Sequence, residues 1–153
     1  KYHAFSPIFS ISKIKALNES SMLALDATMR YGFTTQIIPY AIDGVFEDDG
    51  DNFQSGLNLT YVKALGPEGR FMFLPSLGFT RTHYLKNDAA GRVDYLWSLG
   101  LSAMYSFTKH FGMQAFVNYS NKSTNPKGRE KLQDASKYEN FDVGFGLTGQ
   151  YSF

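Results

Sequence analysis

The chain has 153 residues, with 15 lysine and arginine residues against 14 aspartate and glutamate residues, a formal net charge of +1. This balance gives no electrostatic basis for binding nucleic acid, and the absence of cysteine excludes disulfides and thiolate metal sites. The length suits a single domain, residues 1–153, and no stretch approaches the ~20 apolar residues of a transmembrane helix. Aromatic residues are abundant, with 14 Phe and 10 Tyr, although mean hydropathy is only −0.27. A barrel that alternates apolar and polar residues would combine these properties.

Four segments in the first half of the chain alternate apolar with small or polar residues, which is the two-residue period of a β-strand. They cover residues 3–13, 22–31, 36–46 and 53–64. Residues 22–31 show the pattern well, because Leu23, Leu25 and Ala27 fall on one face and Asp26 falls on the other. The third segment is the weakest, since Pro39 has no amide proton for a ladder hydrogen bond.

The second half alternates more regularly. Its segments cover residues 70–85, 93–107, 111–120 and 141–153. In the last one, the apolar Val143 and Phe145 alternate with Gly144 and Gly146. This segment exceeds the roughly 5–6 residues of a typical soluble strand and suits the ~9–11 residues with which a tilted strand crosses a bilayer. Pro75, inside residues 70–85, predicts a local bulge or a misplaced boundary.

The connections between these segments alternate in length. Short turns at residues 31–36, 65–69 and 108–110 would lie at one end of the strands, and longer loops at residues 47–52, 86–92 and 121–137 at the other. Outer-membrane barrels have short periplasmic turns and longer outer loops, so this asymmetry predicts that both chain termini are periplasmic. An even number of strands also permits closure, which removes unpaired edges. The sequence therefore predicts an all-β fold, an antiparallel up-and-down transmembrane β-barrel with eight strands in this chain.

Aromatic residues gather toward both ends of the predicted strands. Near the short turns these are Tyr31, Tyr61, Phe71, Tyr105, Phe107, Phe111, Tyr151 and Phe153. Near the longer loops they are Tyr40, Phe46, Tyr95, Trp97, Tyr119 and Phe141. Two such belts are expected where a barrel wall crosses the two membrane surfaces, whereas a soluble β-sandwich would concentrate its aromatics in mid-strand.

The opposite face of the predicted strands would line the barrel interior. Its charged and amide side chains include Asp26, Arg30, Asp43, Asp94, Gln114, Asn118, Asp142 and Gln150. Many other positions on this face are glycine, serine or threonine, although eight strands leave an interior that side chains normally fill. Two interpretations stay open, a hydrogen-bonded polar filling and a water-filled solute path. The small residues also allow the chain to be the carboxy-terminal part of a wider barrel.

The last strand, which ends in Tyr151-Ser152-Phe153, and the hairpin at residues 105–113 resemble the end of bacterial outer-membrane β-barrel proteins. The resemblance covers general architecture along the chain and a specific motif only over the last strand. It implies an outer-membrane location and contact with lipid and lipopolysaccharide, whose phosphates could meet Lys122 and other cations of the 121–137 loop if that loop is not simply solvated. It also implies a signal for the barrel-assembly machinery at Val143, Phe145, Tyr151 and Phe153.

The sequence predicts a non-enzymatic membrane protein that acts as an anchor, an interaction scaffold or a narrow porin-like passage. A lipid A deacylase is the enzymatic alternative, because residues 118–121 (N-Y-S-N) lie where such enzymes carry a catalytic motif. That motif lacks its histidine here, so Ser120 has no general base. His3, His83 and His110 share no ligand spacing, and we expect no metal and no cofactor. The sequence indicates no particular protein partner.

Overall fold

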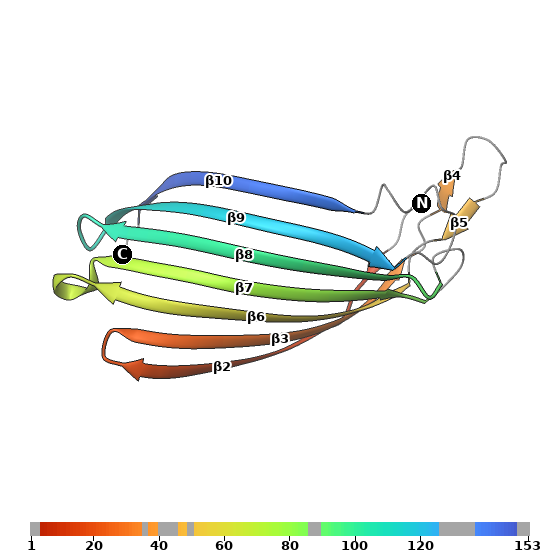
Figure 1. Ribbon diagram of the computed structural model, residues 1–153, viewed down its shortest axis with the longest axis horizontal. Helices are drawn as coiled ribbons and strands as arrows, with labels where there is room; N and C mark the ends of the chain where they lie inside the picture. Colours follow the sequence, from red (N-terminus) through yellow and green to blue (C-terminus); the bar gives the residue numbers. More distant parts are fainter. Residues whose placement is uncertain are drawn as a thin grey trace.

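The computed structural model describes residues 4–34, 37–39, 46–48, 51–85, 90–125 and 137–149. These residues form an all-β fold dominated by one antiparallel sheet (Figure 1). A single 3₁₀ turn, η1 (Pro67–Gly69), interrupts the strands within the described ranges. No helix in this part of the chain is long and apolar enough to cross a membrane.

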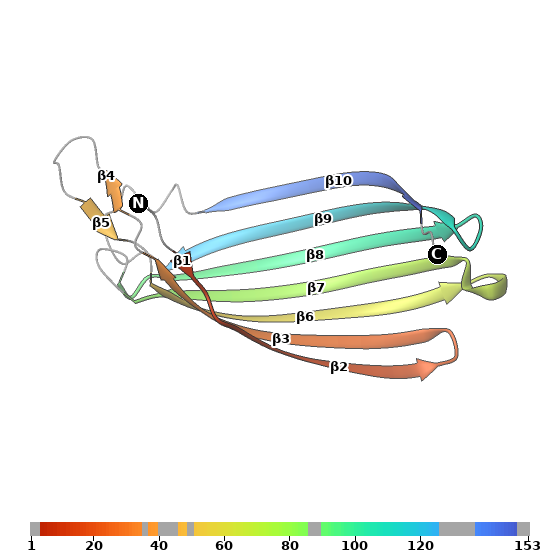
Figure 2. The same ribbon diagram turned by 180° about the vertical axis from the view of Figure 1, so that it is seen from behind.

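The strands of the large sheet follow one another in an up-and-down order (Figures 1 and 2). β1 (Ala4–Phe5) and β2 (Ile8–Asn18) pair with successive parts of β3 (Ser21–Thr34), so together they make one interrupted edge strand. The sheet continues through β6 (Asn52–Leu65), β7 (Phe71–Tyr84), β8 (Val93–Ser106), β9 (Phe111–Asn125) and β10 (Tyr138–Gly149). With β1 and β2 counted as one strand, the sheet has seven strands. The predicted antiparallel, up-and-down, all-β arrangement is confirmed.

The pairing register keeps apolar residues opposite apolar residues. Leu99 of β8 pairs with Leu77 of β7 and with Tyr119 of β9. One residue earlier, Ser98 pairs with Gly78 and Ser120. Because successive side chains of a strand point to opposite sides, the sheet has an apolar face and a polar face.

The predicted third strand, residues 36–46, is wrong. β4 (Ile37–Pro39) pairs only with β5 (Phe46–Asp48), in a small sheet separate from the large one. β4 ends at Pro39, which cannot donate a ladder hydrogen bond, and the described parts of this segment pair with each other instead of joining the large sheet. The large sheet therefore has seven strands rather than eight, and β3 extends to Thr34 through most of the predicted turn at residues 31–36.

A turn that the alternation does not reveal joins β2 to β3. The side-chain oxygen of Asn18 accepts hydrogen bonds from the backbone N–H of Ser20 at 3.0 Å and from its hydroxyl at 3.1 Å. Such a local side-chain contact favours a tight turn. This turn lies at the same end of the sheet as the β6–β7 and β8–β9 turns, the short-turn end (Figure 1). The β3–β6, β7–β8 and β9–β10 connections lie at the opposite end, the long-loop end.

The two edges of the sheet are β2 and β10, and no other described strand pairs with their outer sides. The described residues therefore form an open sheet and not the predicted closed barrel of eight strands. Because the number of strands is odd, β1 begins at the long-loop end and β10 finishes at the short-turn end (Figures 1 and 2). The expectation that both chain ends share one rim depended on eight strands, and the described ends of the chain lie at opposite rims.

The disturbance predicted at Pro75 takes the form of a gap in pairing. β6 and β7 pair as far as Thr60 with Ser76 and resume at Lys63 with Phe73 in the same register. On its other side, Pro75 pairs with Leu101 without interruption. Pro75 thus interrupts one ladder without producing the register shift of a bulge.

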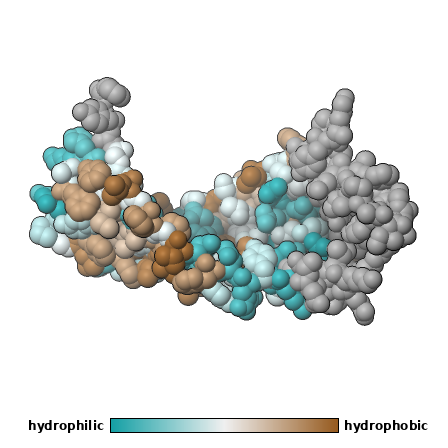
Figure 3. Space-filling view, turned by 90° about the horizontal axis from the view of Figure 1, so that it is seen from above, coloured by the Kyte–Doolittle hydropathy of each residue, from teal (hydrophilic) through white to brown (hydrophobic). Residues whose placement is uncertain are grey.

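The apolar face is open in this single-layered sheet. Leu77 is 47% exposed, Leu99 is 59% exposed and Phe145 is 83% exposed. Val93 is the one buried hydrophobic residue of the described chain. Seen from above, hydrophobic residues predominate over the half of the visible surface nearer the short-turn end, and hydrophilic residues over the part toward the long-loop end (Figure 3). The described residues supply no second layer for this face.

The apolar side chains of this face form a band that crosses the strands obliquely, hereafter the apolar band. One row of paired residues lies inside it on six successive strands: Phe141, Tyr119, Leu99, Leu77, Leu59 and Leu25. On β2 the same row holds Lys13, and the apolar Phe9 and Ile11 lie nearer the long-loop end. From β2 to β10, the band thus moves toward the short-turn end.

Candidate functional site

The polar face carries the predicted interior residues that the structure describes: Asp26, Arg30, Asp94, Gln114, Asn118 and Asp142. Asp43 and Gln150 lie outside the described residues. The six do not form one cluster. Asn118 pairs with Asp142, whereas Arg30 and Asp94 share another row through Gln54 and Thr82. The polar residues therefore line the face along its length.

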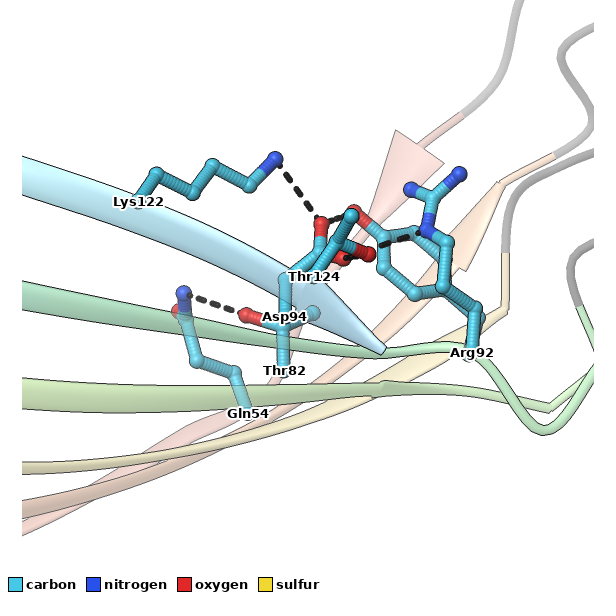
Figure 4. A network of polar contacts seen from close by, with 7 residues as sticks. Gln54, Thr82, Arg92, Asp94, Lys122 and Thr124 are labelled. Carbon is cyan, nitrogen blue, oxygen red and sulfur yellow. Dashed lines mark hydrogen bonds and ion pairs between the residues drawn. The ribbon is translucent and has the colours of Figure 1, made fainter. Parts of the chain in front are cut away.

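The most connected group surrounds Asp94, at the long-loop end of the polar face (Figure 4). Asp94 is 3% exposed. Its Oδ1 accepts a hydrogen bond from Thr124 Oγ1 at 2.6 Å and lies 3.2 Å from Arg92 Nε. Its Oδ2 lies 2.8 Å from Lys122 Nζ and accepts a hydrogen bond from the Tyr84 hydroxyl at 3.3 Å. One carboxylate thus ties together the ends of β7, β8 and β9.

The charges of this group suit its burial. The side chains of Arg92 and Lys122 are 18% and 21% exposed, and a buried carboxylate is tolerated when cations and hydrogen-bond donors surround it. Arg92 Nε lies at ion-pair distance from Asp94 without hydrogen-bond geometry. The Arg92 guanidinium also lies 3.8 Å from the centre of the Tyr84 ring, a cation–π contact.

Sequence patterns did not single out Tyr84, Arg92 or Thr124 as site residues, and they assigned Lys122 to the 121–137 loop instead of the polar face. The predicted seventh strand ends at residue 120, which leaves Lys122 in a loop, but β9 continues to Asn125. Alternation beyond Ser120 would have placed Lys122 and Thr124 on the polar face. The contact between Arg92 and Tyr84 has no comparable signal, because it depends on how the β7–β8 connection folds.

A recess of about 310 Å³ opens on the polar face beside Asp94. The side chains around it come from six strands and include Arg30, Gln54, Thr82, Asp94, Lys122 and Tyr138. Gln54 donates a hydrogen bond to Thr82 at 3.3 Å, and Arg30 donates one to Ser6 at 3.2 Å. This lining suits water or a polar solute. The described residues contain no group of three or more side chains suited to holding a metal ion.

Several glycines of the polar face lie directly against side chains of neighbouring strands, although a Cβ atom at Gly146 would have no other atom within 4 Å. A Cβ atom at Gly144 would lie 2.5 Å from the ring of Phe116, and one at Gly56 would lie 2.8 Å from Thr28 Oγ1. Both separations are too short for a real contact. These glycines therefore make room for their neighbours, so their small size is not by itself a sign of a water-filled gap.

The residues considered for catalysis lie on different faces. Ser120 pairs with Ser98 on the polar face, whereas His83 pairs with Val93 on the apolar face. His110 belongs to the β8–β9 turn at the short-turn end. Among the described residues, the structure thus brings no histidine beside Ser120, and the absence of enzymatic activity stays a prediction.

Two residues of the predicted assembly signal are described. Val143 and Phe145 lie on the apolar face of β10 and are 65% and 83% exposed. Tyr151 and Phe153 lie outside the described residues. Recognition of this strand by assembly machinery stays a prediction.

No family model, curated protein or solved structure matches this chain. The geometry of the sheet and its two faces is therefore the basis for assigning a function.

Proposed function

We propose that this chain forms part of the wall of a bacterial outer-membrane β-barrel and acts as a porin-like passage without catalytic chemistry. Its apolar face would contact lipid, and its polar face would line an aqueous lumen. The apolar band is the observation that carries the proposal. Large exposed apolar surfaces mark contacts with membranes or other proteins, and the course of this band favours a membrane.

The slope of the apolar band matches the tilt of barrel strands. At the long-loop end the band begins at Phe5, which pairs with Phe33 on β3. On β10 the band begins at Phe141, which lies in the row of Leu25. Phe33 and Leu25 are 8 residues apart on β3, so the long-loop limit of the band shifts by roughly 8 residues across the sheet. At about 3.3 Å per residue and about 4.8 Å between strands, this shift over seven strands corresponds to a tilt of roughly 40°. Barrel strands tilt by about 35–45°, and a flat membrane would trace such an oblique band across them.

The polar face supports an aqueous lumen. One central row of this face contains Asp26, Asn58, Ser98, Ser120 and Asn140. Asp26 also accepts a hydrogen bond from the Ser12 hydroxyl at 2.5 Å. Membrane barrels combine a polar interior with an apolar outer surface. The passage, as opposed to a pure anchor, is favoured by the recess beside Asp94.

In the proposed barrel, further strands lie between the two edge strands, β10 and β2. These two strands are parallel to each other, because seven antiparallel strands separate their directions by an even number of reversals. If β10 paired directly with β2, within one chain or between copies in a ring, the two strands would form a parallel pair in an otherwise antiparallel barrel. A β10–β10 pair between two copies would be antiparallel, but it would place their long loops on opposite sides of the membrane. An odd number of further antiparallel strands satisfies both edges.

The single tryptophan provides a direct test of lipid contact. Trp97 is 51% exposed on the apolar face of β8, near the long-loop limit of the band. In lipid vesicles, acyl chains brominated near the headgroup should quench its fluorescence strongly, and aqueous iodide should quench it weakly. The matched variant W97F/S98W moves the indole to the polar face, where the order of quenching should reverse. Equal iodide quenching of the two proteins would contradict a lipid-facing band.

Measuring ion conductance tests whether the protein forms a passage. The full-length protein in planar bilayers should give discrete current steps. Ser98→Arg adds a cation to the polar face and should shift ion selectivity toward anions, whereas Leu99→Phe on the apolar face should leave selectivity unchanged. A membrane-inserted protein that shows no current steps would indicate an anchor or scaffold instead.

A further inference from the structure

Three lysines interrupt the apolar face in one region. Lys13 and Lys15 lie on β2, paired with Leu25 and Leu23, and Lys63 lies on β6, paired with Ser21. Lys13 occupies the row that holds Leu25, Leu59 and Leu77 on the next three strands. A lysine among lipid-facing leucines would be costly if that row lay parallel to the membrane surface.

The oblique course of the apolar band removes this conflict. If the strands tilt by roughly 40°, a row of paired residues is not parallel to the membrane surface. From β7 back to β2, each strand places its residue of the row closer to the short-turn surface of the membrane, by about one to two residues per strand. Lys15 and Lys63 then lie roughly level with Phe71, the first residue of β7 after the β6–β7 turn. Lys13 lies one row higher, from where a long lysine side chain can extend to the interface. All three ammonium groups would reach the same membrane surface.

Lys63 is held in place by neighbouring hydroxyl groups. Its Nζ donates hydrogen bonds to Ser20 Oγ at 2.8 Å and to Ser21 Oγ at 3.0 Å. The Tyr61 hydroxyl donates to Ser21 Oγ at 3.3 Å. These contacts place one cation and three hydroxyl groups at the short-turn end of β3 and β6.

Charge and spacing together define the ligand. Lys15 pairs with Leu23, which pairs in turn with Tyr61, so the β2 and β6 backbones are about 10 Å apart at this level. Lysine side chains reach far enough from both strands to approach a single group between them. Glu19 is the one acidic residue of the β2–β3 turn, which leaves the region with an excess of positive charge.

We infer that Lys13, Lys15 and Lys63, with Ser20 and Ser21, bind the phosphate of an anionic phospholipid in the leaflet at the short-turn end. The inference rests on the proposed membrane placement and adds a lipid class to it. Phosphate is the anionic group present at that level of a phospholipid bilayer, and cations near an anionic membrane surface are attracted to it. Free phosphate has the same chemistry, but it lacks the acyl chains that the adjoining Leu23 and Leu25 would contact.

The test compares stability in two kinds of vesicle. Urea unfolding of the full-length protein is measured in phosphatidylcholine vesicles and in phosphatidylcholine vesicles that contain phosphatidylglycerol. Phosphatidylglycerol should raise the folding equilibrium constant of the wild-type protein. In the double variant K13Q/K15Q, the increase caused by phosphatidylglycerol should be smaller by a factor of about ten. Lys137→Gln removes one positive charge just before β10, beyond the long-loop limit of the band, and should retain the gain. The variant K13R/K15R keeps both charges and should also retain it.

Two results would overturn the inference. One is a wild-type stability that does not depend on phosphatidylglycerol, and the other is an equal loss in Lys137→Gln. Inorganic phosphate, added to phosphatidylcholine vesicles, should not reproduce the effect, and full reproduction would reject a lipid as the ligand. Quenching of Trp97 by brominated lipid is measured on the same samples. If brominated lipid quenches Trp97 but phosphatidylglycerol has no effect on stability, only the lysine site is rejected. If brominated lipid does not quench Trp97, the membrane placement is rejected.

Discussion

An arginine in place of Leu99 should lower the free energy of unfolding in lipid vesicles by about 2–4 kcal/mol, the cost of arginine on the lipid-facing side of a membrane barrel. Leu99 lies inside the apolar band, between Leu77 and Tyr119, and is 59% exposed. In water, replacing such an exposed leucine would change stability by no more than about 0.5 kcal/mol. The size of the effect therefore reports whether this face contacts lipid.

The neighbouring residue provides the matched control for Leu99→Arg. Ser98 lies on the polar face and pairs with two small residues, Gly78 and Ser120. Ser98→Arg should cost about 1 kcal/mol or less, because the new charge would enter an aqueous lumen. Urea unfolding in the same vesicles measures both variants. Equal costs for the two arginines would contradict the assignment of the two faces.

Replacing Asp94 by asparagine should cost about 2–4 kcal/mol, because it leaves the cations of Arg92 and Lys122 without their carboxylate. Removing one partner of a buried ion pair costs about 3–5 kcal/mol. The side chains of Arg92 and Lys122 are still 18% and 21% exposed, so solvent screening should reduce the cost to the expected value of about 2–4 kcal/mol. Unfolding in vesicles measures the change, and limited proteolysis should show earlier cleavage in the β7–β8 connection.

Two further variants separate this network from a general effect of negative charge. Asp142→Asn also removes a carboxylate from the polar face, but this carboxylate is exposed and accepts a hydrogen bond from Asn140 at 2.7 Å. It should change stability by no more than about 0.5 kcal/mol. The double variant D94N/K122Q removes one unpaired cation and should recover part of the loss. Additive losses in that double variant would show that Asp94 and Lys122 are not coupled.

The two faces of the sheet were predictable because a strand has a fixed two-residue period. Leu77, Leu99 and Tyr119 had to fall on one side of their strands, and each strand shows its own alternation without reference to the others. The pairing register then brought these residues into one row. Local pattern and tertiary pairing agree wherever the alternation is strong.

The number of strands was not predictable in the same way. Residues 36–46 alternate weakly, and alternation cannot distinguish a strand of the large sheet from the arms of a small hairpin. Pro39 indicated a disturbance, but the pairing of β4 with β5 is a contact between segments that the pattern does not specify. Because of this error, the predicted number of strands was even, whereas the described sheet has an odd number. The predicted position of the chain ends was therefore also wrong.

The surroundings of Asp94 show the same limit at the level of a site. Its position on the polar face followed from alternation in β8. Its partners come from β7, β9 and the β7–β8 connection, and their selection depends on register and on side-chain reach. The tilt likewise became visible only when the apolar limits of paired strands could be compared.

In the proposed barrel, the oblique band also constrains the sequence of the strand that would pair with the outer side of β2. A strand that pairs with the free side of β2 would continue the slope, so its apolar residues should lie opposite Phe5 to Phe9 and extend beyond them toward the long-loop end. Opposite Ile11 to Lys15, its outward positions should already be polar or basic. The band thus serves as a template against which a candidate neighbouring segment can be aligned, and a segment that fits would define the next strand pair of the proposed barrel.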